Sequence, residues 1–389
     1  MMSNKLKVCV AITARPSYSR IRSALESLKR NSDVELVVLC SGSALLGRYG
    51  KVVDLIKSDG FHVTEELYTF VEGNEPINMA LTAANTINHT ASALRRINPD
   101  FVISIADRYE TLGTAVAAAY LSIPLIHMQG GEITGNIDEK VRHAVTKLAD
   151  IHLVANRRAA DRLVRMGEHP SRVIVTGCPS IDIAREAMTI DMSAVQDALR
   201  RSGVGADVNL AGDYLVVLQH PDTDTYSESY AQMQATLEAV QLLDMPTIVF
   251  WPNVDAGSDA TSKCIRVYRE SGKLKQVHYV KNLEGKLFLR LLRGAGCLIG
   301  NSSVGLRECA YLGVPVVNIG GRQLGRDRAS NVTDVGHEAE AIEKAVRAQL
   351  SHGLYSSSDL YGNGQAGQEI GHVIAALKKA GTEKRFYEA

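Results

Sequence analysis

The sequence predicts an α/β protein made of two Rossmann-like domains that face each other across a cleft. Its 389 residues are too many for one ordinary hydrophobic core, so two domains are expected. Short β-rich runs alternate with helical patterns, and this alternation restarts in the second half of the chain. Strands that alternate with helices form right-handed βαβ units and mainly parallel sheets.

The first half of the chain contains short apolar runs that are typical of buried strands. After the first of them, Ile21, Leu25 and Leu28 recur on one helical face, and the stretches 82–97 and 111–121 have helical patterns as well. The strand candidates are Val8–Ile12, Glu35–Cys40, Phe101–Ile105, Pro124–Met128, Ile151–Val154 and Val173–Thr176.

The second half repeats this organisation after a polar, Gly-containing stretch at 177–213, which is expected to join the two halves. The predicted division is an N-terminal domain at 1–180, a C-terminal nucleotide-binding domain at 181–370, and a C-terminal helix and tail at 371–389. The strand candidates of the second half are Leu215–Gln219, Thr247–Phe250, Gln276–Val280, Cys297–Ile299 and Val314–Ile319.

The overall charge is balanced, with 43 basic and 43 acidic residues. No net field therefore favours nucleic acid or an anionic membrane, and no apolar stretch approaches the ~20 residues of a membrane span. The apolar run Val8–Thr13 is short and is followed by Arg15-Pro16, which indicates a strand and not a signal peptide. The six cysteines form no C-x-x-C pair, so we expect reduced core thiols in a soluble cytoplasmic protein.

Ligands of doubly wound sheets bind at the carboxyl ends of strands, beside helix N-termini, and the strongest motif lies in such a place. It is the segment 300–308, which follows the Cys297–Ile299 run. Ser302 and Ser303 would offer hydroxyl and backbone N–H groups to a phosphate. Glu308, about one and a half helical turns further on, would accept hydrogen bonds from ribose hydroxyls. The alternative is that one of the serines only caps the helix.

Charged residues also follow two strands of the first half. Arg15 precedes Pro16 at a predicted helix start, where its guanidinium would bind phosphate oxygens in bidentate fashion. Taken alone, the segment is explained more simply by a solvent-exposed arginine. Asp107 and Arg108 end a later strand and would lie near the polar segment described next. The glycine fingerprint of a dinucleotide site is absent after the first strand, which argues against a dehydrogenase.

The densest polar segment runs from 127 to 143 and comprises a strand end, a Gly-rich loop and a helix start. Asp138 and Arg142 are spaced four residues apart, as are Glu139 and His143, so surface pairs on a helix are the simplest interpretation. A loop with this many polar groups between two apolar elements is nevertheless typical of the wall of a site.

His220 opens the second half in the corresponding place, directly after a strand. A histidine there can carry a charge or form hydrogen bonds near neutral pH, whereas a lone histidine is more often structural. Asp222 and Asp224 have the D-x-D spacing of a metal site in some sugar transferases, but short acidic loops are common. No other cluster has metal-ligand spacing, so no metal is expected.

Taken together, these segments resemble the hydrolysing UDP-N-acetylglucosamine 2-epimerases, the first enzymes of sialic-acid-type pathways. The matches run from Arg15 to about Arg326, and their order and spacing are specific. They include Asp107-Arg108, His127–His143, Gly177–Ser180, Leu218–Pro221, Pro252–Ser258, Asn301–Glu308 and Arg322–Arg326.

The resemblance implies a fold of the glycosyltransferase-B type, no metal or other cofactor, and a homodimer or homotetramer. It also implies a reaction in two halves. The nucleoside diphosphate is first eliminated across C1–C2 of the sugar, and water then adds to the glycal to give a free C2-inverted sugar of the N-acetylmannosamine type. This chemistry needs a base for the C2 proton, an acid or base for the water step, and cations for the departing diphosphate.

Carried over residue by residue, the resemblance makes Asp107 and Asp138 the carboxylates of the reacting centre, with Glu132, Gln129 and His220 in the same catalytic set. The residues that it implies for the nucleotide are Arg15, His220, Ser302 and Ser303 on the diphosphate and Glu308 on the ribose. The remaining substrate contacts that it implies are Phe288 and Asn253 near the nucleoside and sugar, Arg142, His143 and Arg322 on the sugar and phosphate side, and Ser19 and Arg108.

One position departs from the family pattern. Many relatives have Glu two residues after His127, where this chain has Gln129. An amide cannot act as a proton-transfer base, so either Glu132 or Asp138 takes that duty or the substrate differs. The sugar, which is N-acetylglucosamine or a 2,4-diacetamido sugar, and the nucleotide, which is UDP or another, therefore stay open.

Two other classes of protein are compatible with these motifs. A glycosyltransferase of the same fold would keep the nucleotide site but need an acceptor cleft, so its donor would stay mostly intact without an acceptor. A non-catalytic sugar-nucleotide sensor would bind UDP and turn nothing over. The charged residues that crowd positions 127–143 argue against a sensor, although the fold alone would not.

Overall fold

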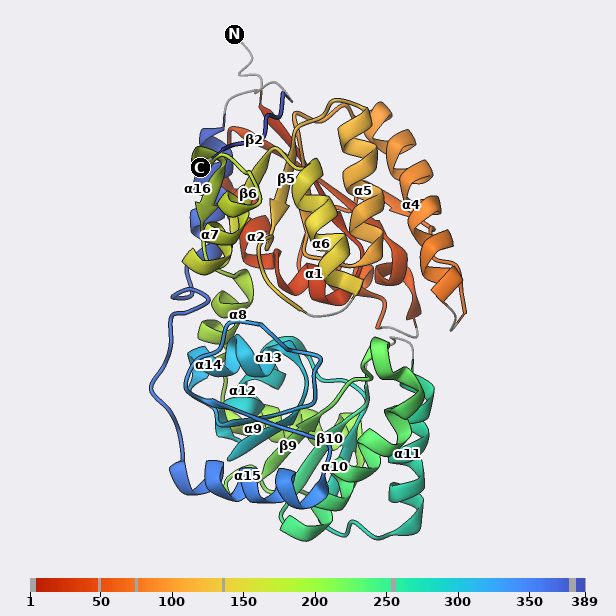
Figure 1. The fold of residues 1–389 in the computed structure, drawn as a ribbon, viewed down its shortest axis with the longest axis vertical. Coiled ribbons are helices and arrows are strands. Elements are labelled where there is room, and N and C mark those ends of the chain that lie inside the picture. Colours follow the sequence, from red (N-terminus) through yellow and green to blue (C-terminus); the bar gives the residue numbers. More distant parts are fainter. Residues whose placement is uncertain are drawn as a thin grey trace. The chain divides into compact units, whose positions relative to one another are not determined.

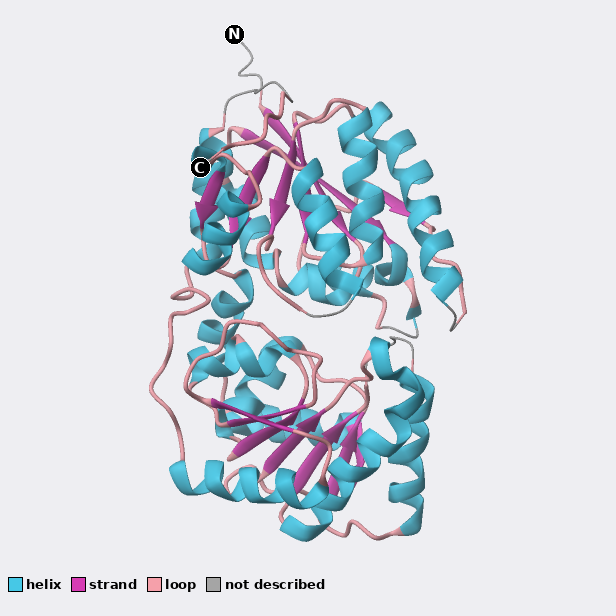
Figure 2. Cartoon of the chain, in the orientation of Figure 1, coloured by secondary structure: helices cyan, strands magenta, loops and turns pink. Residues whose placement is uncertain are grey.

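The computed structural model describes residues 5–47, 50–73, 76–134, 137–252, 257–377 and 383–388. The chain divides into two compact units, each with a sheet covered by helices (Figure 2). The first unit comprises Met1–Glu132, Ile137–Asp182 and Gly362–Ala389, and the second comprises Ile133–Asn136 and Ile183–Tyr361. The predicted α/β class with two Rossmann-like domains is confirmed.

The sheet of the first unit is parallel throughout, in the order β3-β2-β1-β4-β5-β6-β7. Strands β2, β5 and β6 are labelled in Figure 1. The order reverses between β1 and β4, which is the topological switch point where doubly wound sheets bind ligands. The strands are β1 (Leu6–Ile12), β2 (Val34–Ser41), β3 (Glu65–Leu67), β4 (Phe101–Ile105), β5 (Leu125–Met128), β6 (Ile151–Val154) and β7 (Val173–Val175).

Helices connect these strands and bury one apolar face each. In α2, for example, Ala24, Leu25 and Leu28 are buried while Lys29 and Arg30 are exposed in the last turn. The helices are α1 (Arg15–Ser19), α2 (Arg22–Arg30), η1 (Gly42–Leu45), α3 (Val52–Ser58), α4 (Pro76–Ile97), α5 (Tyr109–Tyr120), α6 (Ile137–Leu148), α7 (Arg157–Arg165), η3 (Pro170–Arg172) and α16 (Ala366–Ala376). Helix α8 (Pro179–Ala187) begins in the first unit and continues into the second after Asp182.

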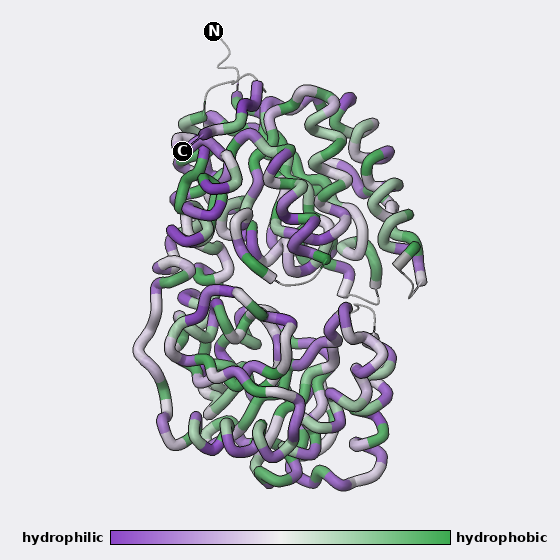
Figure 3. The backbone as a smooth tube through the Cα atoms, viewed as in Figure 1, coloured by the Kyte–Doolittle hydropathy of each residue, from purple (hydrophilic) through white to green (hydrophobic). Residues whose placement is uncertain are grey.

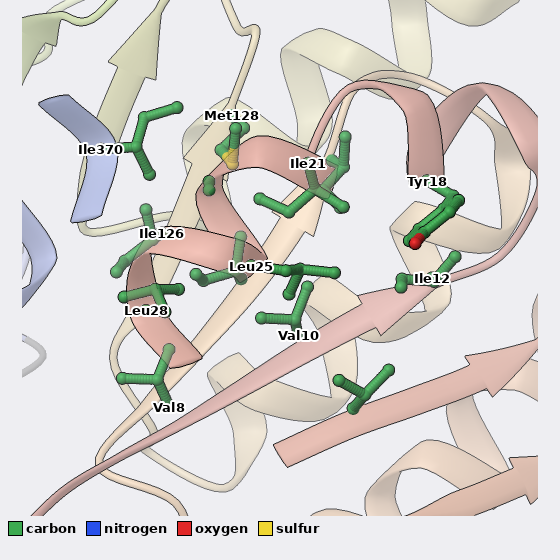
Figure 4. Close-up of a cluster of buried hydrophobic side chains, with 14 of the residues drawn as sticks. Val8, Val10, Ile12, Tyr18, Ile21, Leu25, Leu28, Ile126, Met128 and Ile370 are labelled. Carbon is green, nitrogen blue, oxygen red and sulfur yellow. The ribbon is translucent and has the colours of Figure 1, made fainter. Parts of the chain in front are cut away.

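Strand β1 runs through the main core of this unit. Val8, Val10 and Ile12 are fully buried and point toward α2, where Leu25 meets them (Figure 4). Ile370 of α16 belongs to the same cluster. The tube in Figure 3 is mostly hydrophobic along the strands and alternates along the helices, as expected when each helix buries one face against a sheet. Each fully buried Val or Ile side chain of this core stabilises the fold by roughly 1.5–3 kcal/mol.

Helix α16 packs on the first unit, although it follows the second unit in the sequence. The two carboxylate oxygens of Asp182 accept the N–H groups of Ala366 at 2.9 Å and Gly367 at 2.6 Å. A Cβ on Gly367 would lie 2.4 Å from Ser23 of α2, so glycine permits this close approach. The sequence assigned 371–389 to a separate helix and tail, and the structure differs because these long-range contacts leave no local pattern.

Residues 383–388 also join the first unit, through the buried carboxylate of Glu168. Its Oε2 accepts hydrogen bonds from Lys384 Nζ at 2.7 Å and His152 Nε2 at 2.9 Å, and its Oε1 accepts one from Lys147 Nζ at 2.7 Å. Burial alone would raise the pKa of Glu168. The three hydrogen bonds outweigh burial and lower the pKa from 4.5 to about 2.

The sheet of the second unit follows the order β14-β13-β12-β9-β10-β11-β8, and its order reverses between β9 and β12. Only β8 is antiparallel to its neighbour among the described pairings. The strands are β8 (Gly203–Gly205), β9 (Leu215–Leu218), β10 (Thr247–Phe250), β11 (Val277–Val280), β12 (Cys297–Gly300), β13 (Val316–Ile319) and β14 (Val332–Val335). The sequence missed β3, β8 and β14, which are short and only partly buried.

The stretch 177–213 contains the boundary between the two units, which lies between Asp182 and Ile183, as expected for a stretch that joins the two halves. It contains α8, α9 and β8, and α9 is capped by Asp191, whose Oδ1 accepts the N–H of Ser193 at 2.7 Å. Val195 and Leu199 bury the apolar face of α9 in a core of the second unit. The remaining helices are α9 (Met192–Ser202), η4 (Thr223–Glu228), α10 (Ser229–Leu243), α11 (Ser258–Ser271), α12 (Gly285–Gly294), α13 (Ser303–Leu306), α14 (Glu308–Leu312) and α15 (Ala339–His352).

All six cysteines are buried and none forms a disulfide, which confirms the expectation of free core thiols. Burial raises the pKa of Cys9 and of Cys297 to about 12, so these thiols stay protonated. Within the described ranges, no helix is long and apolar enough to span a membrane.

Glu168 should make the stability of the first unit sensitive to acid. Because folding depresses its pKa, its contribution is fully present above pH 4.5 and is lost as the pH falls toward 2. We expect Glu168→Gln to be less stable than the parent at pH 7, with a smaller further loss of unfolding free energy between pH 5 and 2. Chemical denaturation across this pH range measures it, with the exposed Glu383→Gln as control. Parallel stability curves for parent and Glu168→Gln would contradict the assignment.

Candidate active site

A buried ion pair organises the switch point of the first unit. Asp107 follows β4, and its Oδ2 accepts a hydrogen bond from Nη2 of Arg142, a residue of α6 that is only 1% exposed. Nη1 of Arg142 donates to the carbonyl of Glu132 at 2.6 Å, and Nη1 of Arg20 lies 4.0 Å from Oδ1 of Asp107. The arrangement joins the end of β4, the Gly-rich loop and α6.

Asp138 lies in the first turn of α6, one turn before Arg142, and its side chain is half-buried. Asp107, which Arg142 binds, and Asp138, one helical turn before Arg142, therefore lie in the same part of the first unit. His143, in the middle of α6, is exposed, and its Nε2 lies 3.7 Å from Oε1 of Glu139, which is the surface pair that the four-residue spacing predicted.

Arg108 is held by a carboxylate that the sequence analysis did not single out. Glu110, in the first turn of α5, is fully buried, and its Oε2 accepts a hydrogen bond from Nε of Arg108 at 3.2 Å. The Arg108 guanidinium also stacks 5.2 Å from the ring of Tyr109. A buried charge needs such a partner, so Glu110 fixes the position of Arg108.

Gln129 lies at the end of β5 with its side chain buried. Its φ of 64° is in the left-handed region that a non-glycine residue rarely adopts, and Ala106, at the end of the neighbouring β4, has the same φ. Nε2 of Gln129 donates to the thiol of Cys178 at 3.1 Å, and that sulfur lies 3.1 Å from the hydroxyl of Ser180. Strained backbone at two adjacent strand ends is typical of functional sites.

His127 of β5 links α6 to the end of β4 through hydrogen bonds from its buried ring. Burial lowers its pKa to about 3, so the imidazole is neutral. Its Nε2 lies 2.9 Å from the carbonyl of Ala106, which can only accept, and its Nδ1 lies 3.1 Å from Oγ1 of Thr146. Nε2 therefore carries the proton and Nδ1 accepts from the threonine hydroxyl.

The helix after β1 carries Arg15 and Ser19. Arg15 is the first residue of α1 and is half-buried, with its Nη2 only 2.8 Å from where a Cβ on Gly50 would lie. Ser19 donates to the carbonyl of Pro16 at 3.0 Å within the same helix. The hydroxyl of Ser17 accepts the N–H of Ala14 at 3.0 Å and shapes the turn from strand to helix.

In the second unit, Asn301 bridges the two strands on either side of the switch point. It follows β12, and its Oδ1 accepts the backbone N–H of His220, which follows β9, at 2.8 Å. Its Nδ2 donates to the backbone carbonyl of His220, also at 2.8 Å. This double hydrogen bond fixes the backbone from which the His220 side chain projects.

Ser302 and Ser303 begin α13, and Ser302 occupies the N-cap position without a capping hydrogen bond from its side chain. The alternative that Ser302 only caps the helix would require this hydrogen bond, which its side chain does not make. Helix α13 ends at Leu306, because Arg307 adopts φ −103° and ψ −76°, and α14 begins at Glu308. The expectation of Glu308 within one continuous helix was wrong.

Arg322 and Gln323 converge on the same loop. Nη1 of Arg322 lies 3.3 Å from the carbonyl of Asn301, and Nε2 of Gln323 donates to it at 2.9 Å. Phe288 of α12 packs edge-on against Phe250 with ring centroids 5.1 Å apart. Asn253 lies outside the described residues.

Asp222 caps a short helix. Its Oδ1 accepts the N–H of Asp224 at 3.3 Å at the start of η4. The D-x-D spacing is therefore explained locally by helix capping. In the part of the chain that the structure describes, no group of three or more His, Cys, Asp or Glu residues is arranged to hold a metal ion.

Comparison with known families identifies the family of this chain. The profile of the family described as UDP-N-acetylglucosamine 2-epimerase matches residues 26–375. The chain belongs to this family. The resemblance inferred from the motifs is thereby confirmed, and the chain is an enzyme of the epimerase family.

Several curated epimerases are similar over nearly the whole chain. The UDP-N,N'-diacetylbacillosamine 2-epimerase (hydrolyzing) of Legionella pneumophila is 30% identical over 371 residues, which covers 95% of this chain and 96% of that protein. The UDP-N-acetylglucosamine 2-epimerase of Neisseria meningitidis is 28% identical, covering 92% and 90%. The GDP/UDP-N,N'-diacetylbacillosamine 2-epimerase (hydrolyzing) of Campylobacter jejuni is 26% identical, covering 88% of each chain.

Solved structures of the epimerase family share the fold. The Neisseria meningitidis UDP-GlcNAc 2-epimerase bound to UDP-GlcNAc has a TM-score of 0.78 at 17% identity, covering 95% of this chain and 99% of that one. The Methanocaldococcus jannaschii UDP-GlcNAc 2-epimerase in complex with UDP-GlcNAc and UDP has a TM-score of 0.79 at 16% identity, with the same coverage.

Sequence reasoning missed several supporting residues of this epimerase-family chain. Arg20, Glu110 and Cys178 each contact a side chain that had been singled out. Arg162 of α7 donates to the carbonyl of Gly131 at 3.1 Å and so holds the Gly-rich loop. Cys178 and Glu110 had a sequence signal, because each closely follows a strand end and Cys178 lies in the matched segment Gly177–Ser180.

Proposed function

We propose that this chain is a hydrolysing 2-epimerase that converts a UDP-N-acetylglucosamine-type sugar nucleotide to nucleoside diphosphate and the free C2-inverted sugar. The ion pair between Asp107 and Arg142 carries the proposal, because it brings one carboxylate to the helix that bears a second one, Asp138. A reaction that removes one proton and returns another needs two such groups. Membership of the epimerase family supports the same reaction.

The proposed reaction has two balanced steps. In the first, a base removes the proton at C2 while the C1–O bond to the diphosphate breaks, which leaves a glycal. In the second, water gives its hydroxyl to C1 and a proton returns to C2 from the opposite face. We assign the proton transfers to Asp107 and Asp138, with Glu132 as the alternative carrier. Gln129 exchanges no proton and is assigned a hydrogen bond to the sugar.

The nucleotide is assigned to the second unit together with Arg15. His220, Ser302 and Ser303 would bind the diphosphate, and Glu308 the ribose hydroxyls. The Ser302 hydroxyl makes no capping bond, which supports a role toward a ligand. No metal is assigned, because cationic side chains and backbone N–H groups supply the charge. The further substrate contacts that we propose are Ser19, Arg108, Arg142, His143, Asn253, Phe288 and Arg322.

A 2,4-diacetamido sugar nucleotide is the second candidate substrate. The Legionella and Campylobacter relatives carry diacetylbacillosamine in their names, and the neutral Gln129 lies at a position assigned to the sugar. A glycosyltransferase of the same fold is the alternative class of enzyme.

One experiment separates these functions. Proton NMR in heavy water, with UDP-N-acetylglucosamine and in parallel with its 2,4-diacetamido counterpart, should reveal release of UDP, inversion at C2 and deuterium at C2 with one of the two. Release of UDP without deuterium at C2 would overturn the elimination step. A donor that stays intact with both substrates would favour a transferase or a binding protein.

Asp107→Asn and Asp138→Asn should each lower turnover by about 100-fold or more, the usual range for an acid–base group. UDP affinity should be retained, because neither carboxylate is assigned to the nucleotide. Steady-state kinetics and calorimetry with UDP measure the two effects, and Glu139→Gln, a neighbouring carboxylate on α6, is the control. Near-normal turnover in both Asp variants would remove the assignment.

Ser302→Ala combined with Ser303→Ala, and separately Glu308→Ala, should weaken UDP binding by roughly 1–3 kcal/mol per lost partner of a charged group. The unfolding free energy should change little in Ser302→Ala, because no capping bond is lost. Asp191→Ala is the matched contrast, since it removes a true cap at a cost of ~1 kcal/mol without altering UDP affinity. Calorimetry that gives parental UDP affinity for both serine and glutamate variants would refute the nucleotide assignment.

Gln129→Glu should fail to accelerate the enzyme. It would place a carboxylate in a buried position beside the Cys178 thiol, which cannot compensate a charge, so we expect lower stability and no gain in turnover. Gln129→Ala should weaken binding of the sugar nucleotide while UDP affinity is unchanged. If Gln129→Glu raises turnover ~100-fold, the scale of a restored acid–base group, the proton assignment is wrong.

A further inference from the structure

The helix that carries Asp138 and Arg142 is fastened at its far end by a residue from much later in the chain. The last carbonyls of α6 lack partners within the helix (α6 in Figure 1). Nζ of Lys384 donates to the carbonyl of Thr146 in the last turn at 2.9 Å and to that of Ala149, the residue directly after α6, at 2.5 Å. A cation at this end also complements the helix dipole, so Lys384 caps α6.

Lys384 is itself held by a buried carboxylate. Its Nζ lies 2.7 Å from Oε2 of Glu168, which is only 3% exposed and also binds His152. The other oxygen of Glu168 accepts from Lys147 of α6, whose Nζ donates to the carbonyl of Met166 at 3.0 Å as well. Glu168 therefore ties Lys384 and the last turn of α6 to the same point.

The residues around Lys384 dock by separate contacts. The N–H of Tyr387 donates to the carbonyl of Gly167 at 2.9 Å. The Phe386 ring covers Gly167, where a Cβ would lie 2.2 Å from the ring, and the ring lies 5.4 Å from the ammonium group of Lys147. Tyr387 also meets the ring of His169 edge-on at 5.0 Å. These contacts fix segment 383–388 against the first unit.

The capped turn of α6 is bonded to the active-site strand end. Thr146, whose carbonyl binds Lys384, also donates its hydroxyl to Nδ1 of His127. His127 donates from Nε2 to the carbonyl of Ala106, the residue before Asp107. A continuous set of hydrogen bonds thus runs from Lys384 through α6 and β5 to the end of β4.

We propose that Lys384 is a positioning residue of the active site. It fixes the last turn of α6 and so holds Asp138 and Arg142 in register with Asp107, while touching no substrate itself. The kinetic part of this inference rests on the proposed epimerase function. Its structural part, the ordering of α6, does not.

The test compares Lys384→Met with Arg385→Met, which removes a neighbouring cation whose side chain is 91% exposed. In Lys384→Met we expect kcat to fall roughly 10- to 100-fold, the scale of a small misplacement of catalytic groups, with KM and UDP affinity unchanged. Amide hydrogen exchange should become faster in α6 and stay the same in α4. Arg385→Met should match the parent in both measurements.

A second variant keeps the inference testable if Lys384→Met does not fold. Phe386→Ala removes a ring that is 68% exposed, and it should loosen segment 383–388 and raise exchange in α6 in the same direction. Parental kcat and parental α6 exchange in Lys384→Met would overturn the inference. Absence of turnover in the parent protein would instead overturn the proposed function, and α6 exchange would still decide the role of Lys384.

Discussion

The buried guanidinium of Arg142 is the constraint on which the site of the first unit depends. An unpaired charge at 1% exposure would cost several kcal/mol, so its partners are not optional. Those partners are Asp107 at the end of β4 and the carbonyl of Glu132 in the Gly-rich loop. Satisfying one side chain therefore sets β4, the loop and α6 in register together. The left-handed residue Ala106 directly before Asp107 is tolerated because this surrounding structure determines its position.

The second unit also has to hold together two strand ends at the point where its strand order reverses, and it does so with neutral groups. Its strand order also reverses once, between β9 and β12, and the amide of Asn301 joins the two strand ends by binding both backbone groups of His220. A neutral amide satisfies a backbone pair without adding charge. The Ser302 hydroxyl, at the N-cap of α13 directly after Asn301, makes no capping hydrogen bond. The first unit thus joins its strand ends through a buried ion pair, whereas the second joins them through a neutral amide.

The sequence predicted the features that local pattern determines. The buried strands have continuous apolar runs, such as β1 and β12, and polar motifs follow them because parallel strands end at one edge of a sheet. It did not predict features that depend on residues far apart in the chain. The Asp182 carboxylate binds the start of α16 across more than 180 residues. The break at Arg307 between α13 and α14 follows Gly305, but no proline marks it in the sequence. Short strands at the sheet edges, such as β14, have too little apolar content to be distinguished from loops.

Position 129 shows how packing and chemistry are linked in this chain. The family pattern often has a carboxylate there, but here the buried side chain donates to a thiol that is next to a serine hydroxyl. A thiol is a weak acceptor, and this hydrogen bond needs the N–H donor of an amide, so a carboxylate at position 129 would lose it. The presence of an amide at position 129 is therefore linked to its contact with Cys178. At position 129 this chain therefore has a buried hydrogen-bond donor and no carboxylate that could exchange a proton.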